Sequence, residues 1–148
     1  YQVGVNIVCY SKFGQRGADQ TDEGIEIKPG VSVLSAPLKF NMDGCVKFAY
    51  PHGHDELLMV ALENKSSRET LLRTVPEVGA DGTFRDFRPH QVYRDDKGFT
   101  VTKRDDYEMV MVHHHPLQNP NIHHGMGNYL LYMTPGVCPR SANTASAR

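Results

Sequence analysis

Short apolar segments separated by turn-forming residues make up most of the chain. They are rich in Val, Ile, Leu, Met and aromatic residues, and several alternate apolar with polar positions. Alternation with a period of two is typical of strands that bury one face. We therefore expect strands at residues 2–11, 31–34, 38–40, 45–50, 70–74, 98–103, 108–113 and 128–133.

The pattern of residues 56–63 (ELLMVALE) fits two conformations. Its composition favours a helix, whereas its length and its neighbours favour a strand. No other segment has the pattern of a long helix, and many short strands at regular spacing indicate an all-β fold. We expect a single antiparallel β-sandwich of the jelly-roll type over residues 1–134. The chain turns small and polar after Cys138, and we expect residues 135–148 to form a loosely held tail.

Composition excludes several classes of protein. A chain of 148 residues can bury a real core, and 39% hydrophobic with 22% charged residues is ordinary for a soluble globular protein. A formal net charge of −1 gives no reason to expect a nucleic acid or an anionic membrane as partner. No run approaches the ~18 apolar residues of a membrane span. Because the chain begins at Tyr1 without a signal-peptide pattern, we expect a mature or trimmed form of a secreted or periplasmic protein.

Three cysteines, Cys9, Cys45 and Cys138, are widely spaced along the chain. None lies in a CxxC motif, which argues against a zinc ribbon or a thioredoxin-like site. One disulfide with one remaining thiol is compatible with this spacing, and three pairings are open. Three buried, reduced cysteines are an equally good interpretation.

The motif His52-Gly53-His54 is a candidate metal-binding pair. If the segment is extended, His52 and His54 point to the same side, because side chains alternate along a strand. Two imidazoles on one side of a strand can hold one metal ion, and imidazole suits copper, zinc, iron and nickel. The alternative is a solvent-facing pair at a strand end.

Met126 is a candidate third ligand. It follows His123 and His124 and stands between Gly125 and Gly127, where the bare backbone suits close approach better than core packing. Thioether sulfur is soft and selects copper(I) over zinc. The predicted site is therefore one copper ion held by His52, His54 and Met126.

Five of the eight histidines fall between residues 113 and 124. On a strand, His113 and His115 share one face, and they could form a second metal site with His123 or His124. A solvated rim of histidines is the alternative. The neighbouring acids Asp55 and Glu56 could orient a ligand histidine, and His90 is isolated and reads as structural.

Several segments together resemble a known family. They are IKPGVSV at 27–33, VKFAYPHGH at 46–54, residues 98–112, NPN at 119–121 and MGNYLLY at 126–132. In this order they resemble the C-terminal domain of the ascorbate-dependent type II copper monooxygenases, the family of peptidylglycine α-hydroxylating monooxygenase and dopamine β-monooxygenase. The similarity covers roughly residues 25–134, and its specific content is the His-x-His, the Asn-Pro-Asn and the methionine.

The resemblance implies a jelly-roll domain in which His52, His54 and Met126 hold copper. In that family the second copper lies on a separate domain, so the resemblance also implies a partner chain or domain that carries a second redox centre. Gly125 stands where the family usually has an acidic residue before the methionine.

The sequence is compatible with four alternative functions. The first is a copper-binding domain with a redox or copper-handling role, and the second is half of a copper monooxygenase that hydroxylates a C–H bond. The third is a structural β-sandwich subunit of an extracellular assembly, without a catalytic metal, whose exposed strands pair with neighbours. The fourth is a cupin-type metal dioxygenase, suggested by His52-x-His54 and by the spacing of His124 and Asn128. It would use iron or another hard metal, without Met126.

Overall fold

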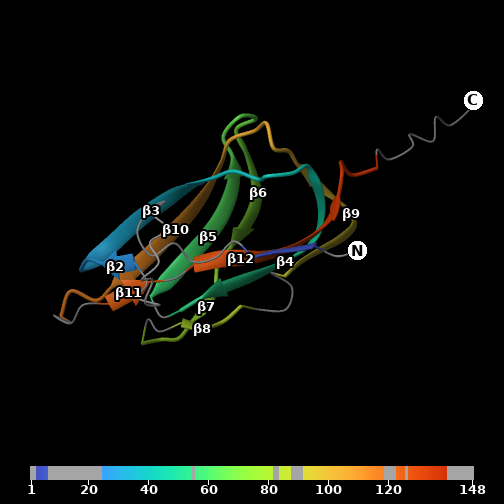
Figure 1. Ribbon diagram of the computed structural model, residues 1–148. Helices are drawn as coiled ribbons and strands as arrows, with labels where there is room; N and C mark the ends of the chain where they lie inside the picture. The colour runs from blue at the N-terminus through green and yellow to red at the C-terminus, as the bar shows by residue number, and fades with distance from the viewer. Residues whose placement is uncertain are drawn as a thin grey trace, which may run out of the picture.

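The computed structural model of the chain contains two antiparallel four-stranded sheets (Figure 1). The structure describes residues 3–6, 25–54, 56–81, 84–87, 92–118, 123–125 and 127–139. In spatial order, the first sheet consists of β1 (Val3–Asn6), β12 (Gly127–Pro135), β4 (Gly44–Gly53) and β9 (Tyr93–Val101). The second consists of β3 (Gly30–Leu38), β10 (Tyr107–His115), β5 (Leu57–Asn64) and β6 (Glu69–Thr74).

Two short antiparallel pairs complete the described strands. They are β2 (Ile25–Ile27) with β11 (His123–Gly125), and β7 (Glu77–Val78) with β8 (Phe84–Asp86). Among the described residues there is no helix of the length and apolarity needed to cross a membrane.

The strand order confirms the predicted jelly roll. If the eight strands of the two large sheets are counted along the chain, one sheet has the order 1-8-3-6 and the other the order 2-7-4-5. This is the arrangement of two interleaved Greek keys that defines a jelly-roll sandwich. All pairings within the two sheets are antiparallel, as the alternating sequence pattern predicted.

Most predicted strands are present, with shifted boundaries. The ambiguous segment 56–63 is not a helix, because nearly all of it lies in strand β5. The two strands expected at 31–34 and 38–40 are one continuous strand, β3, because Ser35, Ala36 and Pro37 remain paired with β10. The expected strand at 2–11 is confirmed at Val3–Asn6, and residues 7–11 lie outside the described part of the chain.

Alternating residues of β10 and β12 build the core. On β10 the buried positions are Tyr107, Met109 and Met111, followed by two histidines, and on β12 they include Tyr129 and Leu131. These side chains belong to one hydrophobic cluster that also contains residues of β4, β5, β6 and β9. Two sheets that each bury one face against this cluster explain the period of two in the sequence.

The segment after β12 is fastened to the first sheet. Cys138 forms a disulfide with Cys45, which settles the pairing that the sequence left open; Cys9 lies outside the described residues. The Gly136 amide donates to the Asp43 carbonyl, and the Cys138 amide donates to Thr100 Oγ1. Residues 135–138 are therefore held against the first sheet, and residues 140–148, the rest of the expected tail, lie outside the described chain.

Gly98 lies against this disulfide in a conformation that requires glycine. Its φ is +71°, and a methyl group built on it would lie 2.5 Å from the Val46 carbonyl oxygen and 2.8 Å from Cys45 Sγ. Gly136 also has a positive φ, +87°, but a methyl group there would meet no atom within 4 Å. Substitution of Gly136 therefore measures the cost of backbone strain alone, whereas substitution of Gly98 adds the cost of steric overlap.

We expect Gly136→Ala to lower the free energy of unfolding by about 1–2 kcal/mol, the cost of a left-handed conformation at a non-glycine residue. Gly98→Ala should cost about 2–5 kcal/mol, because overpacking adds to the same backbone strain. Urea denaturation of both variants measures the difference. Equal losses would contradict the close packing at Gly98.

Candidate functional site

His52 and His54 form an exposed imidazole pair at the end of β4. Pro51 and Gly53 are buried and the two histidines are exposed, so both rings lie on the outer side of the first sheet. Their ring centroids are 5.0 Å apart and their planes meet at 76°. The prediction that the two side chains share a face is confirmed.

The surroundings of His52 favour its neutral form. Partial burial of the ring, and then the charge of the neighbouring His54, lower the pKa of His52 below its ordinary value. A neutral imidazole has the lone pair that a metal ion needs, so this shift reduces competition from protons.

The start of β12 lies directly beside this pair. Gly127 is opposite Gly53, and Asn128 is opposite His52, in the antiparallel register of β12 with β4. Gly127 is the residue that follows Met126 in the chain, but Met126 itself lies outside the described residues. The predicted third ligand therefore stays a prediction.

The other histidine cluster faces into the sandwich. His113 and His115 are fully buried on β10, and His114 between them is exposed. The prediction that His113 and His115 share a face is confirmed, whereas a solvated rim is wrong for these two and applies only to His114. The strand backbone of His123 and His124 is described in β11, but their side chains are not, so their part in a second metal site stays a prediction.

Glu56 follows the exposed pair in the chain and forms hydrogen bonds to the histidine cluster on β10. Its side chain is buried and its carboxylate accepts a 2.8 Å hydrogen bond from Nδ1 of His115. Its carbonyl oxygen accepts a second bond, also 2.8 Å, from the His114 amide, and its φ of +71° is unusual for a non-glycine residue. The sequence suggested that Asp55 or Glu56 orients a histidine, and the partner of Glu56 is His115; Asp55 lies outside the described residues.

Close packing at Gly127 brings both clusters to one end of the sandwich. A methyl group on Gly127 would lie 3.1 Å from side-chain atoms of Leu57 and Met111, which belong to the second sheet. Leu57 follows Glu56, and Met111 precedes His113 by two positions on the same face of β10. No sequence signal other than the glycine itself marked this contact.

The two clusters do not merge into one site within the described part of the chain. There, no group of three or more His, Cys, Asp or Glu side chains has a geometry that could hold a metal ion. The exposed pair faces outward from the first sheet, and the buried pair lies in the interior. His113, His114 and His115 therefore do not join His52 and His54 in one site among the described residues, and a second metal site that includes His123 or His124 stays a prediction.

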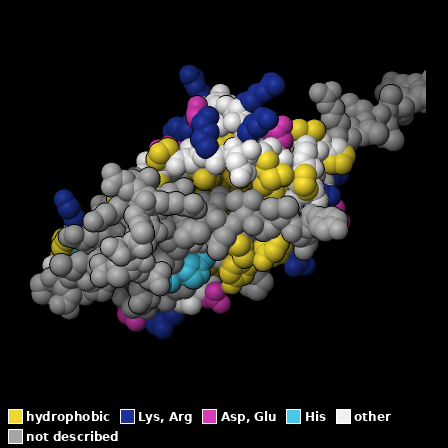
Figure 2. All heavy atoms as spheres, viewed as in Figure 1, with side chains coloured by type: hydrophobic (Ala, Val, Ile, Leu, Met, Phe, Trp, Pro, Cys, Tyr) yellow, Lys and Arg dark blue, Asp and Glu magenta, His cyan; other side chains and the backbone are white. Residues whose placement is uncertain are grey.

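Aromatic and aliphatic side chains continue the outer face beyond the exposed pair. Phe48 and Tyr132 pack edge to face with centroids 5.3 Å apart, and the Arg94 guanidinium lies 5.6 Å from the Phe48 ring centre. Tyr50 and Leu130 are opposite each other on β4 and β12. They lie between the Phe48–Tyr132 pair and His52. Figure 2 shows histidine side chains beside a hydrophobic patch on one face of the molecule.

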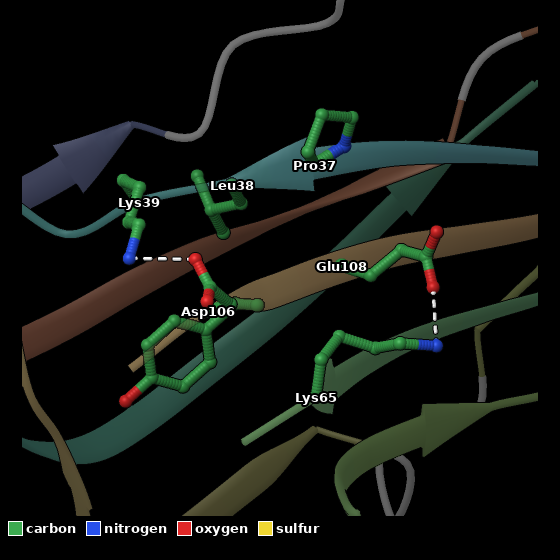
Figure 3. A pocket seen from close by; sticks show the side chains of 7 residues that line it. Pro37, Leu38, Lys39, Lys65, Asp106 and Glu108 are labelled. Carbon is green, nitrogen blue, oxygen red and sulfur yellow. Dashed lines mark ion pairs between the residues drawn. The ribbon is translucent and has the colours of Figure 1, made fainter. Parts of the chain in front are cut away.

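A hollow lined by four charged side chains together with Pro37, Leu38 and Tyr107 lies near the other end of β10. Figure 3 shows its two ion pairs, Lys39 with Asp106 at 2.6 Å and Lys65 with Glu108 at 2.8 Å. A hydrogen bond from Lys65 lowers the pKa of Glu108, and the same contact raises the pKa of Lys65. Because each cation already has an anion beside it, this hollow offers no clear binding chemistry.

Comparison with known proteins gives no family model, no curated protein and no solved structure that matches the chain. The candidate site therefore depends on its own geometry.

We expect Glu56→Ala to lower the free energy of unfolding by about 2–3 kcal/mol, because a buried hydrogen bond that involves a charged group is lost. Alanine at position 56 has the same backbone strain from the positive φ, so the loss of stability reports the missing hydrogen bond to His115. Glu56→Gln should cost less, since its carbonyl oxygen still accepts from His115, and the exposed Glu69→Ala should change stability by less than about 0.5 kcal/mol. Chemical denaturation tests this order, and equal losses for Glu56→Ala and Glu69→Ala would refute it.

Proposed function

We propose that this chain is a copper-binding β-sandwich domain with a redox or copper-handling role, and that His52, His54 and Met126 are its ligands. The observation that carries the proposal is the exposed pair of imidazoles at the end of β4, 5.0 Å apart, beside the start of the strand that follows Met126.

The spacing of the pair fits a shared metal ion. A metal–imidazole bond is about 2 Å long, so two rings bound to one ion have centroids roughly 4–6 Å apart. The observed 5.0 Å lies in this range without a change in the backbone. The lowered pKa of His52 adds support, because it favours the neutral, metal-binding form at neutral pH.

The donor set favours copper over other metals. A structural zinc site uses four ligands, usually thiolates and imidazoles. Two imidazoles and one thioether are fewer and softer, and sulfur of this kind selects copper(I). When bound, copper would supply one-electron chemistry, and the protein's part is to present the pair on an exposed strand end that solvent or a partner can reach.

The disulfide supports the proposed location outside the cytoplasm. Disulfides persist in oxidising compartments and are rare in the cytosol. The Cys45–Cys138 bond therefore agrees with a secreted or periplasmic copper protein.

Replacing His52 or His54 by Ala should lower the affinity for copper(I) by more than about 100-fold, since even changes behind a ligand cost 10–100-fold. Met126→Leu should weaken copper(I) binding much more than copper(II) binding, because only the soft ion gains from sulfur. Competition with a chromogenic copper(I) chelator under anaerobic reducing conditions, and a separate copper(II) titration, measure both effects.

His114→Ala is the matched control, because His114 is also exposed but lies on the outer side of β10. It should bind copper as the unaltered protein does. Unchanged copper(I) affinity in Met126→Leu would remove Met126 from the ligand set, and absence of copper binding by the unaltered protein would overturn the proposal.

A second candidate is half of an ascorbate-dependent monooxygenase, whose other copper would lie on a partner chain or domain. The jelly-roll order supports it, because the resemblance implies this fold with the ligand pair at a strand end. Under this alternative, the copper-loaded protein with its partner should consume oxygen when ascorbate and a C–H substrate are supplied. Oxygen uptake is measured with an oxygen electrode. Copper binding without ascorbate-dependent oxygen uptake would exclude the monooxygenase and favour the redox or copper-handling role.

A further inference from the structure

Strand β3 is a long, uncharged edge strand in which proline, one common obstacle to edge pairing, occurs only near the C-terminal end, at Pro37. It lies at the margin of the second sheet, with β10 on its inner side and no other described strand on its outer side (Figure 1). An edge strand presents backbone N–H and C=O groups that can pair with another strand. At nine residues, β3 is long enough to bind one.

The other three edges of the two large sheets are short or charged. β1 has only four residues, and β6 carries Glu69 and Arg73. β9 carries charged side chains at four consecutive positions, residues 94–97. Short length and charge are the common ways in which proteins prevent edge-to-edge association. β3 and the residue before it, positions 29–38, contain no charged side chain.

Exposed apolar side chains gather along the same edge. Val31 is 67% exposed, Val33 is 69% exposed and Leu117 is 73% exposed. They are the three most exposed large apolar side chains in the described part of the chain, and Leu117 lies 4.0 Å from a methyl group built on Gly30. A contiguous apolar strip along an unpaired edge is typical of an interaction surface.

We propose that β3 binds β3 of a second copy of this chain, antiparallel and centred on Val33, so that two sandwiches share one continuous sheet. A neutral strand can lie beside its own copy without placing like charges opposite each other, which a charged edge such as β9 could not do. Antiparallel pairing of one strand with its own copy has twofold symmetry and closes as a dimer.

The register about Val33 explains the positions of the prolines. It sets Val33 opposite the partner's Val33 and Val31 opposite the partner's Ser35. Pro29 then lies opposite the partner's Pro37, so the residues that lack an N–H fall at the two ends of the paired region. The two copies of Val33 meet at the centre, and each Val31 lies two residues away on the same face of its strand.

Sedimentation analysis of the whole chain tests the proposal. The unaltered protein should show twice the monomer mass as its concentration rises, and Val33→Lys should remain a monomer. Val137→Lys is the matched control, because Val137 is similarly exposed, at 65%, but lies beside the disulfide away from β3. Circular dichroism should show all three folded, because substitutions at exposed positions away from special structural features change stability little.

Cysteine cross-linking tests the register independently. Directly opposite side chains have Cβ atoms about 4.5–5.5 Å apart, so Val33→Cys in a Cys9→Ser background should form a covalent dimer on mild oxidation. Val31→Cys should not, because the two substituted positions of the dimer would be roughly 13 Å apart. An unaltered protein that stays monomeric, a dimer that survives Val33→Lys, or cross-linking through position 31 instead of position 33 would each overturn the proposal. None of these outcomes depends on copper binding.

Discussion

The packing of β10 against the opposite sheet is the constraint on which the rest of the structure depends. Met109 and Met111 occupy the core, and continued alternation places His113 and His115 in the interior at the end of the same strand. Gly127 allows β12 to approach Met111 and Leu57 at this end, where even a methyl group would require these side chains to shift. The exposed pair on β4 is held beside that contact through the pairing of Gly53 with Gly127.

Glu56 shows how a buried polar contact can support an exposed site. The residue lies two positions after His54, and its carboxylate and carbonyl both bond to β10. The Leu57 amide also donates to the His54 carbonyl, so the turn that carries the exposed histidine is fixed at both ends. A strained, buried residue kept next to a candidate ligand is consistent with pre-organisation of the site, since backbone strain tends to persist where function requires it.

The proposed dimer edge and the proposed metal pair lie on different sheets. β3 is in the second sheet, whereas His52 belongs to the first and faces away from the interior. Pairing through β3 would therefore extend one sheet and leave the exposed imidazoles accessible. A partner that carries another redox centre could then still approach the outer face of β4, where aromatic side chains adjoin the pair.

The sequence by itself determined the all-β class, most of the strands and the pairs of side chains that share a face. Each of these follows from local alternation, which groups His52 with His54 and His113 with His115. The jelly-roll order of the strands depends on pairing between distant segments. Only the tertiary structure decided that the first pair faces solvent and the second faces the core, because a period of two does not say which side of a strand meets the other sheet. The Cys45–Cys138 bond, the Glu56–His115 contact and the position of β3 at the margin of its sheet among the described strands also depend on residues far apart in the chain. Long-range register is set by packing of the two sheets.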